Sequence, residues 1–262
     1  MSLLPPFIRA LVRRPSYTMA EGITTQSLGI PDFDKAIEQY GIYLDTLRAC
    51  GLYVTALPPD ERYPDGHFIE DDAVIFGDMA FICNLKEPTR AGEIVEINRN
   101  LAHLQRFYVQ SEDAYIDGGD VLFTRDRVLV GVGNRTNSAG VSYLRAALQK
   151  YNEAIHVDEV PFSGVLHLKT GLTELAPGVL VRSPNIDIDY DLSFSEVYTL
   201  PEEEAYAANC LPINDYLLIA KGNYPVLKRL AEKFYLPDRI FELEMSEFEK
   251  MDGGLTCLSL RY

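Results

Sequence analysis

The sequence predicts an α/β fold in which five copies of one helix-and-strand unit close into a ring. Stretches with helical periodicity alternate with short β-branched and aromatic runs along the whole chain. A polar cluster recurs at steps of 46, 50, 43 and 47 residues, at Asp71, Asp117, His167, Cys210 and Cys257. A near-constant period of this length is typical of a repeated supersecondary unit. Five units with nothing left over favour a closed ring, because an open stack needs polar capping units.

Four segments carry the apolar spacing of amphipathic helices, at residues 33–50, 91–105, 137–150 and 223–234. In the first segment the apolar side chains fall three or four residues apart, and Gly51 supplies a stop. The fourth unit, between His167 and Cys210, contains no comparable segment. We therefore expect a helix in each unit except the fourth.

Short β-branched and aromatic runs lie between the helical segments and predict strands. These runs are residues 52–57, 68–76, 121–131, 179–182, 216–220 and 255–261. Several of them pair as hairpins, as in residues 121–130, where a polar turn separates two apolar runs. Each unit is expected to run helix, strand, polar turn and hairpin.

The composition is that of an ordinary globular protein. With 262 residues, 47% of them hydrophobic and 24% charged, the chain is long enough to bury a core and is not intrinsically disordered. No window approaches the roughly 18 apolar residues of a spanning helix, and the first twenty residues lack the pattern of a signal peptide. We therefore expect no membrane segment and a cytoplasmic protein. The cysteines Cys50, Cys83, Cys210 and Cys257 are expected to be reduced thiols.

The chain is strongly acidic, with a formal net charge of −15 and a pI near 4.7. An acidic protein without a basic stripe repels phosphate backbones, so nucleic-acid binding is disfavoured. The same field attracts small cations, although a net charge of this size also serves solubility alone.

Three residues on the repeat have the chemistry of a covalent hydrolase. Cys257 follows a glycine pair, His167 is flanked by apolar residues, and Asp117 precedes two glycines. Taken singly, they fit a packed thiol, a core histidine and an acidic turn. If the ring is closed, equivalent positions face one axis, and a thiol, an imidazole and carboxylates converge in one pocket.

Three consecutive acids, Glu70, Asp71 and Asp72, stand within an apolar run. Burying them is costly unless a cation neutralises them, and that cation is a metal, a protein arginine or a ligand. Metal-ligand spacing is lacking and His67 is the only nitrogen ligand nearby, so no metal site is expected.

Five motifs in order resemble the dimethylarginine dimethylaminohydrolase family, which belongs to the guanidine-modifying pentein superfamily. They are Asp65 with Phe68-Ile69-Glu70-Asp71, then Asp117-Gly118-Gly119-Asp120, Asn134-Arg135-Thr136-Asn137, Leu166-His167-Leu168-Lys169, and the stretch from Glu249 to Ser259. The resemblance begins at Leu11 and runs to Cys257. It implies a pentein-type α/β propeller, with five ββαβ units around a pseudo-fivefold axis, and one catalytic domain over residues 1–262.

The resemblance also implies a role for each site residue. Cys257 is the expected nucleophile, His167 the general acid and base, and Asp117 the group that orients the imidazole. Glu70 and Asp71 are expected to hold a guanidinium. The amino-acid end of the substrate is assigned to Asp65, Arg90 and Arg135, with the two arginines on its carboxylate. Asp252 and the backbone of Met251 line the pocket, and Ile23 matches an apolar residue of an N-terminal lid.

The implied activity is hydrolysis of Nω-methylated arginines to citrulline and an alkylamine through a covalent thiouronium, without metal or organic cofactor. Arginine deimination, or hydrolysis of another guanidino acid, is the alternative within the superfamily. A non-catalytic protein that binds cationic amino acids needs only the acids, and a purely structural ring needs none of these groups. The sequence leaves both a monomer and a homodimer open.

Two residues depart from the family pattern, and both bear on the choice of substrate. His67 stands beside the acids where many relatives carry a small or apolar residue. Gly254 replaces a bulkier residue and is expected to loosen the loop that holds Cys257.

Overall fold

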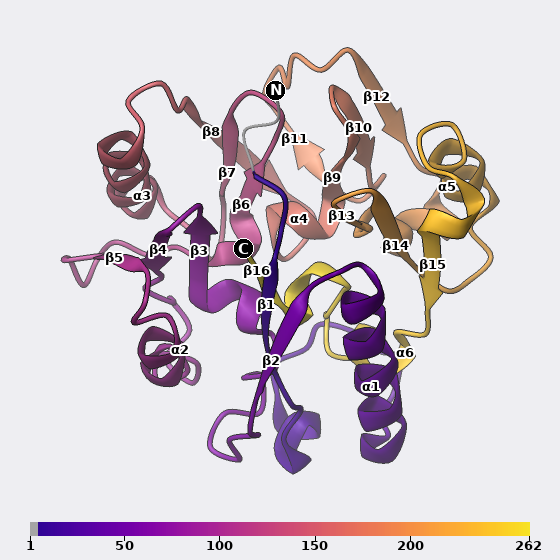
Figure 1. Ribbon diagram of the computed structural model, residues 1–262, viewed down its shortest axis with the longest axis horizontal. Helices are drawn as coiled ribbons and strands as arrows, with labels where there is room; N and C mark the ends of the chain where they lie inside the picture. The colour runs from indigo at the N-terminus through magenta and orange to yellow at the C-terminus, as the bar shows by residue number, and fades with distance from the viewer. Residues whose placement is uncertain (1–4) are drawn as a thin grey trace.

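The computed structural model describes residues 5–262 and arranges them as five units around a central axis (Figure 1). Each unit has two antiparallel strands, and a crossover then leads to a third strand that runs parallel to the second. The helices of the units lie on the outside of the ring, and the first strands of the units lie nearest the axis. This arrangement is the five-unit α/β ring that the sequence predicts.

Three units follow one another between Ala73 and Thr199. The first contains β3 (Ala73–Phe76), β4 (Met79–Ile82), α2 (Ile94–Asn100) and β5 (Gln105–Tyr108). The second contains β6 (Val121–Phe123), β7 (Val128–Val132), α3 (Ser138–Tyr151) and β8 (Val157–Ser163), with β11 (Asp187–Ile188) at its edge. The third contains β9 (Leu172–Ala176), β10 (Val179–Arg182) and β12 (Glu196–Thr199). These strands lie between His167 and Cys210, the stretch in which the sequence predicts no helix, and none connects the last two of them.

The remaining two units complete the ring. The fourth contains β13 (Leu211–Ile213), β14 (Tyr216–Ala220), α5 (Pro225–Ala231) and β15 (Ile240–Leu243). The fifth contains β16 (Leu260–Arg261), β1 (Arg9–Arg13), α1 (Phe33–Ala49) and β2 (Tyr53–Leu57). This last unit is assembled from both ends of the described chain. Its strands β1 and β16 pair antiparallel in the register Ala10 to Arg261 and Leu11 to Leu260, which closes the ring.

A short helical turn precedes the first strand of every unit and lies at the axis. These turns are Ile69–Asp72, Gly118–Asp120, α4 (Leu168–Gly171), Glu202–Ala208 and Thr256–Leu258. Neighbouring turns touch one another, and a hydrogen bond from Asn209 to Thr256 joins the fourth turn to the fifth. The recurring polar residues are therefore brought together at the axis, as the spacing predicts. Outside the units lie the turns Tyr17–Glu21 and Pro237–Arg239 and helix α6 (Ser246–Glu249).

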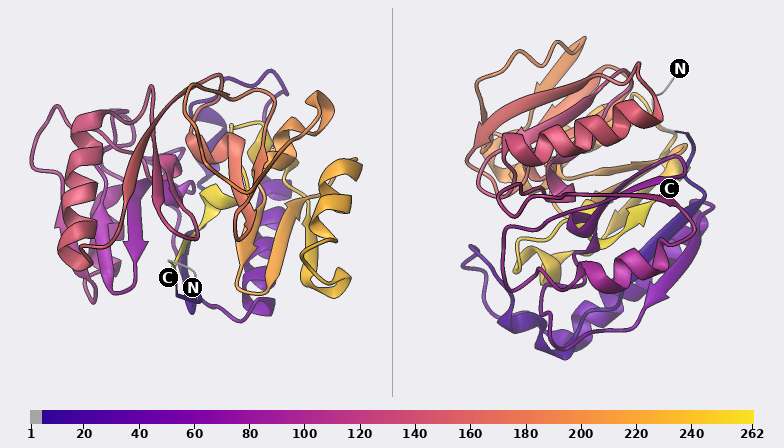
Figure 2. Two further views of the ribbon diagram at one scale, coloured as in Figure 1. Left: turned by 90° about the horizontal axis from the view of Figure 1, so that it is seen from above. Right: turned by 90° about the vertical axis from the view of Figure 1, so that its left-hand side faces the viewer.

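The hydrophobic core lies between the sheets and the outer helices, as the two side views of Figure 2 illustrate. Helix α1 shows how the sequence produces this layer. The Asp32 side chain caps its first turn by accepting the Lys35 N–H at 3.0 Å, and Gly51 ends it with a φ of +90°. Tyr43 and Leu47, one turn apart, are fully buried on its inner face, and burial of each side chain is worth about 2 kcal/mol.

Two expected strands are shorter than the sequence suggests. Residues 69–72 and 256–258 form 3₁₀ turns, and only 73–76 and 260–261 of these runs are strands. A strand would place Glu70 and Asp72 on one face, whereas the 3₁₀ turn directs three consecutive acids to three different surroundings. The expected helices 91–105 and 223–234 are likewise confined to 94–100 and 225–231. Within residues 5–262, no helix has both the length and the apolar character needed to cross a membrane.

Candidate active site

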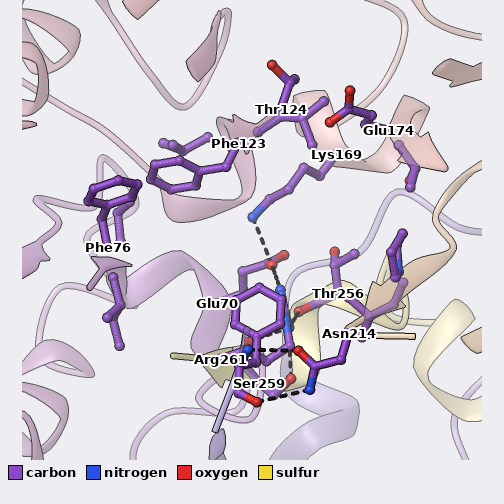
Figure 3. Close-up of a pocket in the computed structure, with 18 of the residues that line it drawn as sticks. Glu70, Phe76, Phe123, Thr124, Lys169, Glu174, Asn214, Thr256, Ser259 and Arg261 are labelled. Carbon is purple, nitrogen blue, oxygen red and sulfur yellow. Dashed lines mark hydrogen bonds and ion pairs between the residues drawn. The ribbon is translucent and has the colours of Figure 1, made fainter. Parts of the chain in front are cut away.

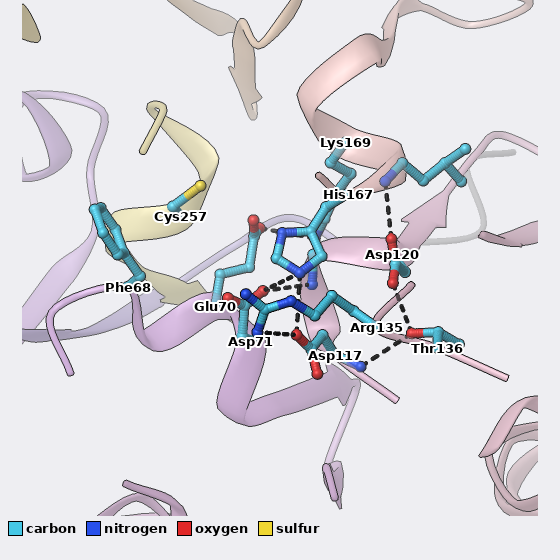
Figure 4. A network of polar contacts seen from close by, with 12 residues as sticks. Phe68, Glu70, Asp71, Asp117, Asp120, Arg135, Thr136, His167, Lys169 and Cys257 are labelled. Atoms are coloured by element: carbon cyan, nitrogen blue, oxygen red, sulfur yellow. Dashed lines mark hydrogen bonds and ion pairs between the residues drawn. The ribbon is translucent and has the colours of Figure 1, made fainter. Parts of the chain in front are cut away.

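A small cavity lies on one side of the ring of axial turns. Cys257, His167 and Asp71 come from three different turns and face this cavity together, and the sulfur of Cys257 is directed toward the imidazole (Figure 4). The cavity measures about 30 Å³. Its other lining residues are Ile23, Asp65, Phe68, Arg90, Arg135, Leu166, Met251, Asp252 and Gly253. Ten of the eleven expected site residues line this cavity or bond to a residue that does, and Glu70 is the exception.

Cys257 is held by a tight turn. The Gly254 N–H donates to its Sγ at 3.4 Å, and Asn209 clamps the neighbouring Thr256 by accepting its N–H at 3.1 Å and donating to its hydroxyl at 3.0 Å. A Cβ at position 254 would collide with the Asn209 carboxamide. Glycine there allows the clamp to close, so the expectation that Gly254 loosens this loop is wrong.

The Cys257 thiol is protonated at neutral pH. Burial, reinforced by the charges of Glu70 and Asp71, raises its pKa to about 12, and the bond from Gly254 opposes this only in part. Cys50, Cys83 and Cys210 are unpaired thiols buried elsewhere, and burial raises the pKa of each. Cys257 is the only cysteine that lines the cavity.

His167 lies between two carboxylates. Its Nε2 is 3.0 Å from Oδ2 of Asp117 and 3.7 Å from Oδ1 of Asp71. Burial lowers the pKa of His167, but the charge of Asp71, the bond to Asp117 and the charge of Asp120 outweigh burial and raise it to about 9. The imidazole is therefore protonated at neutral pH and can donate a proton.

Thr136 and Asp120, which the sequence did not single out, support Asp117 and His167. Thr136 accepts the Asp117 N–H at 3.1 Å and donates its hydroxyl to Asp120 at 2.6 Å. Asp120 in turn accepts the N–H of Leu168 at 2.9 Å, which fixes the turn that follows His167. Both residues stand within the motifs quoted above, and that was the only signal available to find them.

Gly119 explains the glycine pair after Asp117. Its N–H donates to Oδ1 of Asp71 at 3.0 Å. A Cβ there would lie 2.6 Å from Oδ1 of Asp71 and 2.8 Å from Cγ of His167. Only glycine lets the backbone approach both side chains this closely.

Asp71 is paired with Arg90, which is itself paired with Glu93. The Arg90 Nη1 donates to Oδ2 of Asp71 at 2.6 Å, and the rest of the guanidinium faces Glu93 and the Phe68 carbonyl. Burial raises the pKa of Asp71, but His167 and Arg90 outweigh it and lower it to about 2. Asp71 is therefore ionised throughout the physiological range.

Arg135 differs from Arg90 in its lack of bonds. Its Nη1 is buried without a hydrogen-bond partner among residues 5–262, and the carboxylates of Glu87 and Asp117 lie 3.9 Å away. A buried guanidinium with unused donors is a binding group for a carboxylate.

Glu70 lies on the opposite side of the axial turns. It lines a separate cavity of about 1020 Å³, where its Oε1 is 2.8 Å from Nζ of Lys169 and 2.7 Å from Nη2 of Arg261 (Figure 3). The joint grip of Glu70 and Asp71 on one guanidinium is therefore not formed, because consecutive residues of a 3₁₀ turn diverge by about a third of a turn. Asp72, the third acid, is fully buried, and neither of its carboxylate oxygens has a hydrogen-bond partner within residues 5–262.

A loop covers the cavity from the outside. The Ile23 N–H donates to both carboxylate oxygens of Asp65, at 3.1 and 3.2 Å. Two residues further on, Thr25 donates its N–H to Asp252 at 2.5 Å, and Gln26 donates to the same carboxylate. Asp65 and Asp252 thus hold residues 22–26 over the site, with Ile23 lining it.

His67 is packed away from the cavity. Its ring lies 4.0 Å from that of Phe68 and 5.7 Å from that of Phe248, between centroids. Burial, with the charges of Arg90 and Arg13, lowers its pKa to about 3. His67 is therefore neutral and adds no charge to the acid cluster.

Asp71, Asp117 and His167 offer ligand atoms within 4.8 Å of one another, which is close enough to hold a metal ion. The same atoms are already engaged, since Asp71 accepts from Arg90 and Asp117 is bonded to His167. With Arg90 and Arg135 beside them, these groups fit an organic cation that donates hydrogen bonds better than a bare metal ion.

Known proteins resemble the chain over nearly its full length. The arginine deiminase family model matches residues 71–197. N(G),N(G)-dimethylarginine dimethylaminohydrolase of Pseudomonas aeruginosa is 34% identical over 98% of this chain and 100% of that protein. The protein of the same name from Streptomyces coelicolor is 35% identical over 98% of this chain and 97% of that protein.

Solved structures of dimethylarginine dimethylaminohydrolases also resemble the chain over nearly its full length. The Pseudomonas aeruginosa protein, as a cysteine-to-serine mutant complexed with citrulline, superposes with a TM-score of 0.88 at 31% identity, covering 98% of this chain and 100% of that one. A dimethylarginine dimethylaminohydrolase variant in an adduct with S-methyl-L-thiocitrulline superposes with a TM-score of 0.87 at 31% identity, with the same coverage.

Proposed function

This chain belongs to the dimethylarginine dimethylaminohydrolase family, and from that premise we propose that it hydrolyses Nω-methylated arginines to citrulline and an alkylamine. Members of this family are hydrolases of guanidino compounds that act on amidino C–N bonds. One observation carries the finer proposal: the Cys257 thiol, the protonated His167 and the ionised Asp71 face one cavity. Residues 1–262 act in this proposal as a single catalytic domain.

The substrate is held at both ends. Asp71 accepts hydrogen bonds from the guanidinium and places its central carbon in front of Cys257. Arg135 takes the α-carboxylate with its unused donors, and Arg90 contributes through Nη1. Asp65, Asp252, the Met251 backbone and Ile23 enclose the amino-acid end.

The reaction has two covalent steps. When the substrate cation binds, the Cys257 thiol loses its proton to solvent, and the thiolate attacks the guanidine carbon. The tetrahedral adduct collapses when His167 protonates the departing alkylamine and the C–N bond breaks. A thiouronium remains on Cys257. Neutral His167 then removes a proton from water, whose oxygen attacks the same carbon. The C–S bond breaks, the remaining proton on that oxygen passes to the departing sulfur, and citrulline leaves with the thiol and the imidazolium restored. These steps use no metal or organic cofactor.

The substrate itself activates the nucleophile. A thiol with a pKa of about 12 is almost entirely protonated at neutral pH. A guanidinium placed beside the sulfur offsets the charges of Glu70 and Asp71 and lowers the pKa of the thiol. Attack therefore begins only when a cation occupies the site.

Binding requires the covering loop to move. A cavity of about 30 Å³ holds about one water molecule and is far too small for an arginine derivative. Apart from the bond of the Gly22 N–H to the Met19 carbonyl in the preceding turn, residues 22–26 are held by Asp65, Asp252 and the Lys250 carbonyl. In the proposal, release of these bonds opens the site.

The test is citrulline formation from asymmetric dimethylarginine, monomethylarginine and arginine. We expect turnover of the two methylated compounds. Cys257→Ser should bind them without turnover, and His167→Ala should lose turnover with the fold intact by circular dichroism. Citrulline production by Cys257→Ser at the wild-type rate would end the covalent proposal. Binding of methylarginines without turnover by the wild-type protein would support the non-catalytic binder instead.

A second candidate is deimination of free arginine. The arginine deiminase family model matches residues 71–197, which include Asp71, Asp117, Arg135 and His167. The chemistry is identical except that ammonia leaves. A preference for arginine over both methylated compounds in the same assay would establish this alternative.

A further inference from the structure

Glu93 is a buried acid to which the chemistry above gives no role. It stands immediately before helix α2, is 1% exposed, and faces Arg90, which is 5% exposed. The Arg90 Nε lies 3.1 and 3.2 Å from the two Glu93 oxygens, and Nη2 lies 2.9 Å from one of them. This is a bidentate pair, which fixes the plane of the guanidinium as well as its position.

The orientation of Arg90 leaves one edge for the active site. Nη2 also donates to the Phe68 carbonyl at 3.0 Å, so Nε and Nη2 are fully engaged on the Glu93 side. Nη1 points the other way and donates to Asp71 at 2.6 Å. Asp71 accepts a second bond from the Gly119 N–H on its other oxygen, beside His167. A continuous chain of contacts therefore runs from Glu93 through Arg90 and Asp71 to His167.

The net charge of Glu93, Arg90 and Asp71 determines how strongly these side chains attract a cation. Arg90 and Asp71 alone would form a neutral pair with little attraction for a cationic substrate. Burial raises the pKa of Glu93, and the charge and hydrogen bonds of Arg90 oppose that rise and favour the ionised carboxylate. Ionised in this pair, Glu93 supplies the second negative charge, so the three side chains together carry −1. That remaining charge faces the two cations of the reaction, the imidazolium of His167 and the substrate guanidinium.

We propose that Glu93 is a positioning residue that neutralises and orients Arg90, so that the charge of Asp71 acts on the substrate and on His167 without being offset by Arg90. This inference rests on the proposed function for its substrate but not for its effect on His167. Without the Glu93 charge, the field of Arg90 reaches Asp71 and His167 uncompensated.

The other charged groups around this chain do not replace Glu93. Asp72 also faces Glu93 and Arg90, but burial and the Glu93 charge raise its pKa well above the ordinary carboxyl value, which favours its neutral form. Asp65 faces Glu93 and Asp71 across the site and is bonded to Ile23. On the far side of His167 lie Asp117 and Asp120, which Glu93 does not touch.

The test uses the full-length protein and measures the pKa of His167 by NMR titration. Glu93→Gln keeps the shape of the side chain and removes its charge. We expect the pKa of His167 to fall by about one unit, and KM for asymmetric dimethylarginine to rise about tenfold with a smaller change in kcat. Glu93→Asp, which retains the charge, should recover most of both values.

The matched control is Glu96→Gln. Glu96 lies one turn further along the same helix and pairs with a different buried arginine, Arg13, at 3.3 Å. We expect no change in the His167 pKa or in KM. An equal fall in this control would show that any lost acid near α2 has the effect and would overturn the proposal.

A second variant separates charge from structure. The double variant Arg90→Gln/Glu93→Gln restores the net charge of −1, so the pKa of His167 should return to near the wild-type value. If Glu93→Gln does not fold, this double variant decides the question. A folded Glu93→Gln with an unchanged His167 pKa, or a double variant with a lowered one, would refute the role of Glu93. Failure of the wild-type protein to turn over methylarginines would refute the proposed function and leave the NMR result standing.

Discussion

At neutral pH Cys257 and His167, the proposed nucleophile and general acid, are both protonated. Burial and two nearby acids raise the pKa of Cys257 to about 12, whereas the pKa of His167 is raised to about 9 by acids that outweigh its burial. The acids therefore protect the proton that the leaving amine needs and suppress the thiolate. This arrangement makes the thiol unreactive until a cation binds.

Alkylation kinetics test this suppression. The rate at which iodoacetamide modifies Cys257 should rise tenfold per pH unit up to about pH 10 without a plateau, because the thiolate fraction is still far from saturation. Cys257→Ser reports the background from the three buried cysteines. A plateau below pH 8 would show that the thiol is already activated in the unliganded protein.

The two arginines of the site are expected to contribute differently. Arg90 is bonded to Glu93 and Asp71, whereas Nη1 of Arg135 is buried without a hydrogen-bond partner among residues 5–262. Arg135→Gln should raise KM for asymmetric dimethylarginine roughly thirtyfold. The variant loses a charge-assisted bond to the carboxylate, which is worth about 2 kcal/mol of binding free energy.

The same variant should barely affect a dimethylguanidine substrate that lacks the carboxylate. Arg145→Gln serves as the control, since Arg145 pairs with Glu159 at 2.9 Å away from the site. Equal losses with both substrates would contradict the assignment of Arg135 to the carboxylate.

At the scale of elements, two of the axial turns serve both sides of the ring. In the turn Ile69–Asp72, Asp71 faces the small cavity and Glu70 faces the large one. In the turn Thr256–Leu258, Cys257 faces the small cavity and Thr256 faces the large one. Lys169 and Arg261 neutralise Glu70 on the far side. A tight turn separates neighbouring side chains, so one residue can react while the next holds the ring together.

The clamp on the Cys257 turn should carry measurable stability. Asn209→Ala removes bonds to the Lys169 carbonyl, the Thr256 hydroxyl and the Thr256 N–H, and leaves buried groups unpaired. We expect a loss of about 2–3 kcal/mol in the free energy of unfolding, measured with urea, together with lower kcat. Asn100→Ala, which removes one partly buried bond to the Glu96 carbonyl, is the control and should cost less than about 1 kcal/mol. Equal losses of unfolding free energy in the two variants would show that the Asn209 clamp contributes no more stability than the single Asn100 hydrogen bond.

At the scale of the whole molecule, the ring depends on a non-covalent closure. Strand β16 contributes Leu260 to the core and Arg261 to the ion pair with Glu70. The Tyr262 carbonyl accepts the N–H groups of Ile8 and Arg9 at 2.8 and 2.6 Å. The fifth unit therefore forms only when the two ends of the described chain meet.

Deleting residues 260–262 should therefore abolish cooperative unfolding and activity, because it removes strand β16 from one edge of β1 and the Arg261 partner of Glu70. Deleting residues 189–191, three exposed residues between β11 and β12, is the matched control and should leave a cooperative transition. Thermal unfolding by circular dichroism measures both. A truncated protein that melts like the wild type would show that closure does not stabilise the ring.

The sequence by itself determined the five-unit ring and the position of each polar turn on it. Asp71, Asp117, His167 and Cys257 could be found because apolar periodicity and repeat spacing follow from which residues each element buries, and burial is a local property of the chain. The unit without a helix was evident for the same reason.

Only the tertiary structure decided which way the axial side chains point. It separated Glu70 from Asp71, engaged Arg90 while leaving Arg135 largely unbonded, and brought Glu93, Asp120, Thr136 and Asn209 into the site. Most of these outcomes depend on contacts between residues tens to hundreds of positions apart, such as Glu70 with Arg261 and Asn209 with Thr256, and no local pattern contains them. The packing of five units at one axis sets them, because burying a charge there is costly unless a partner neutralises it.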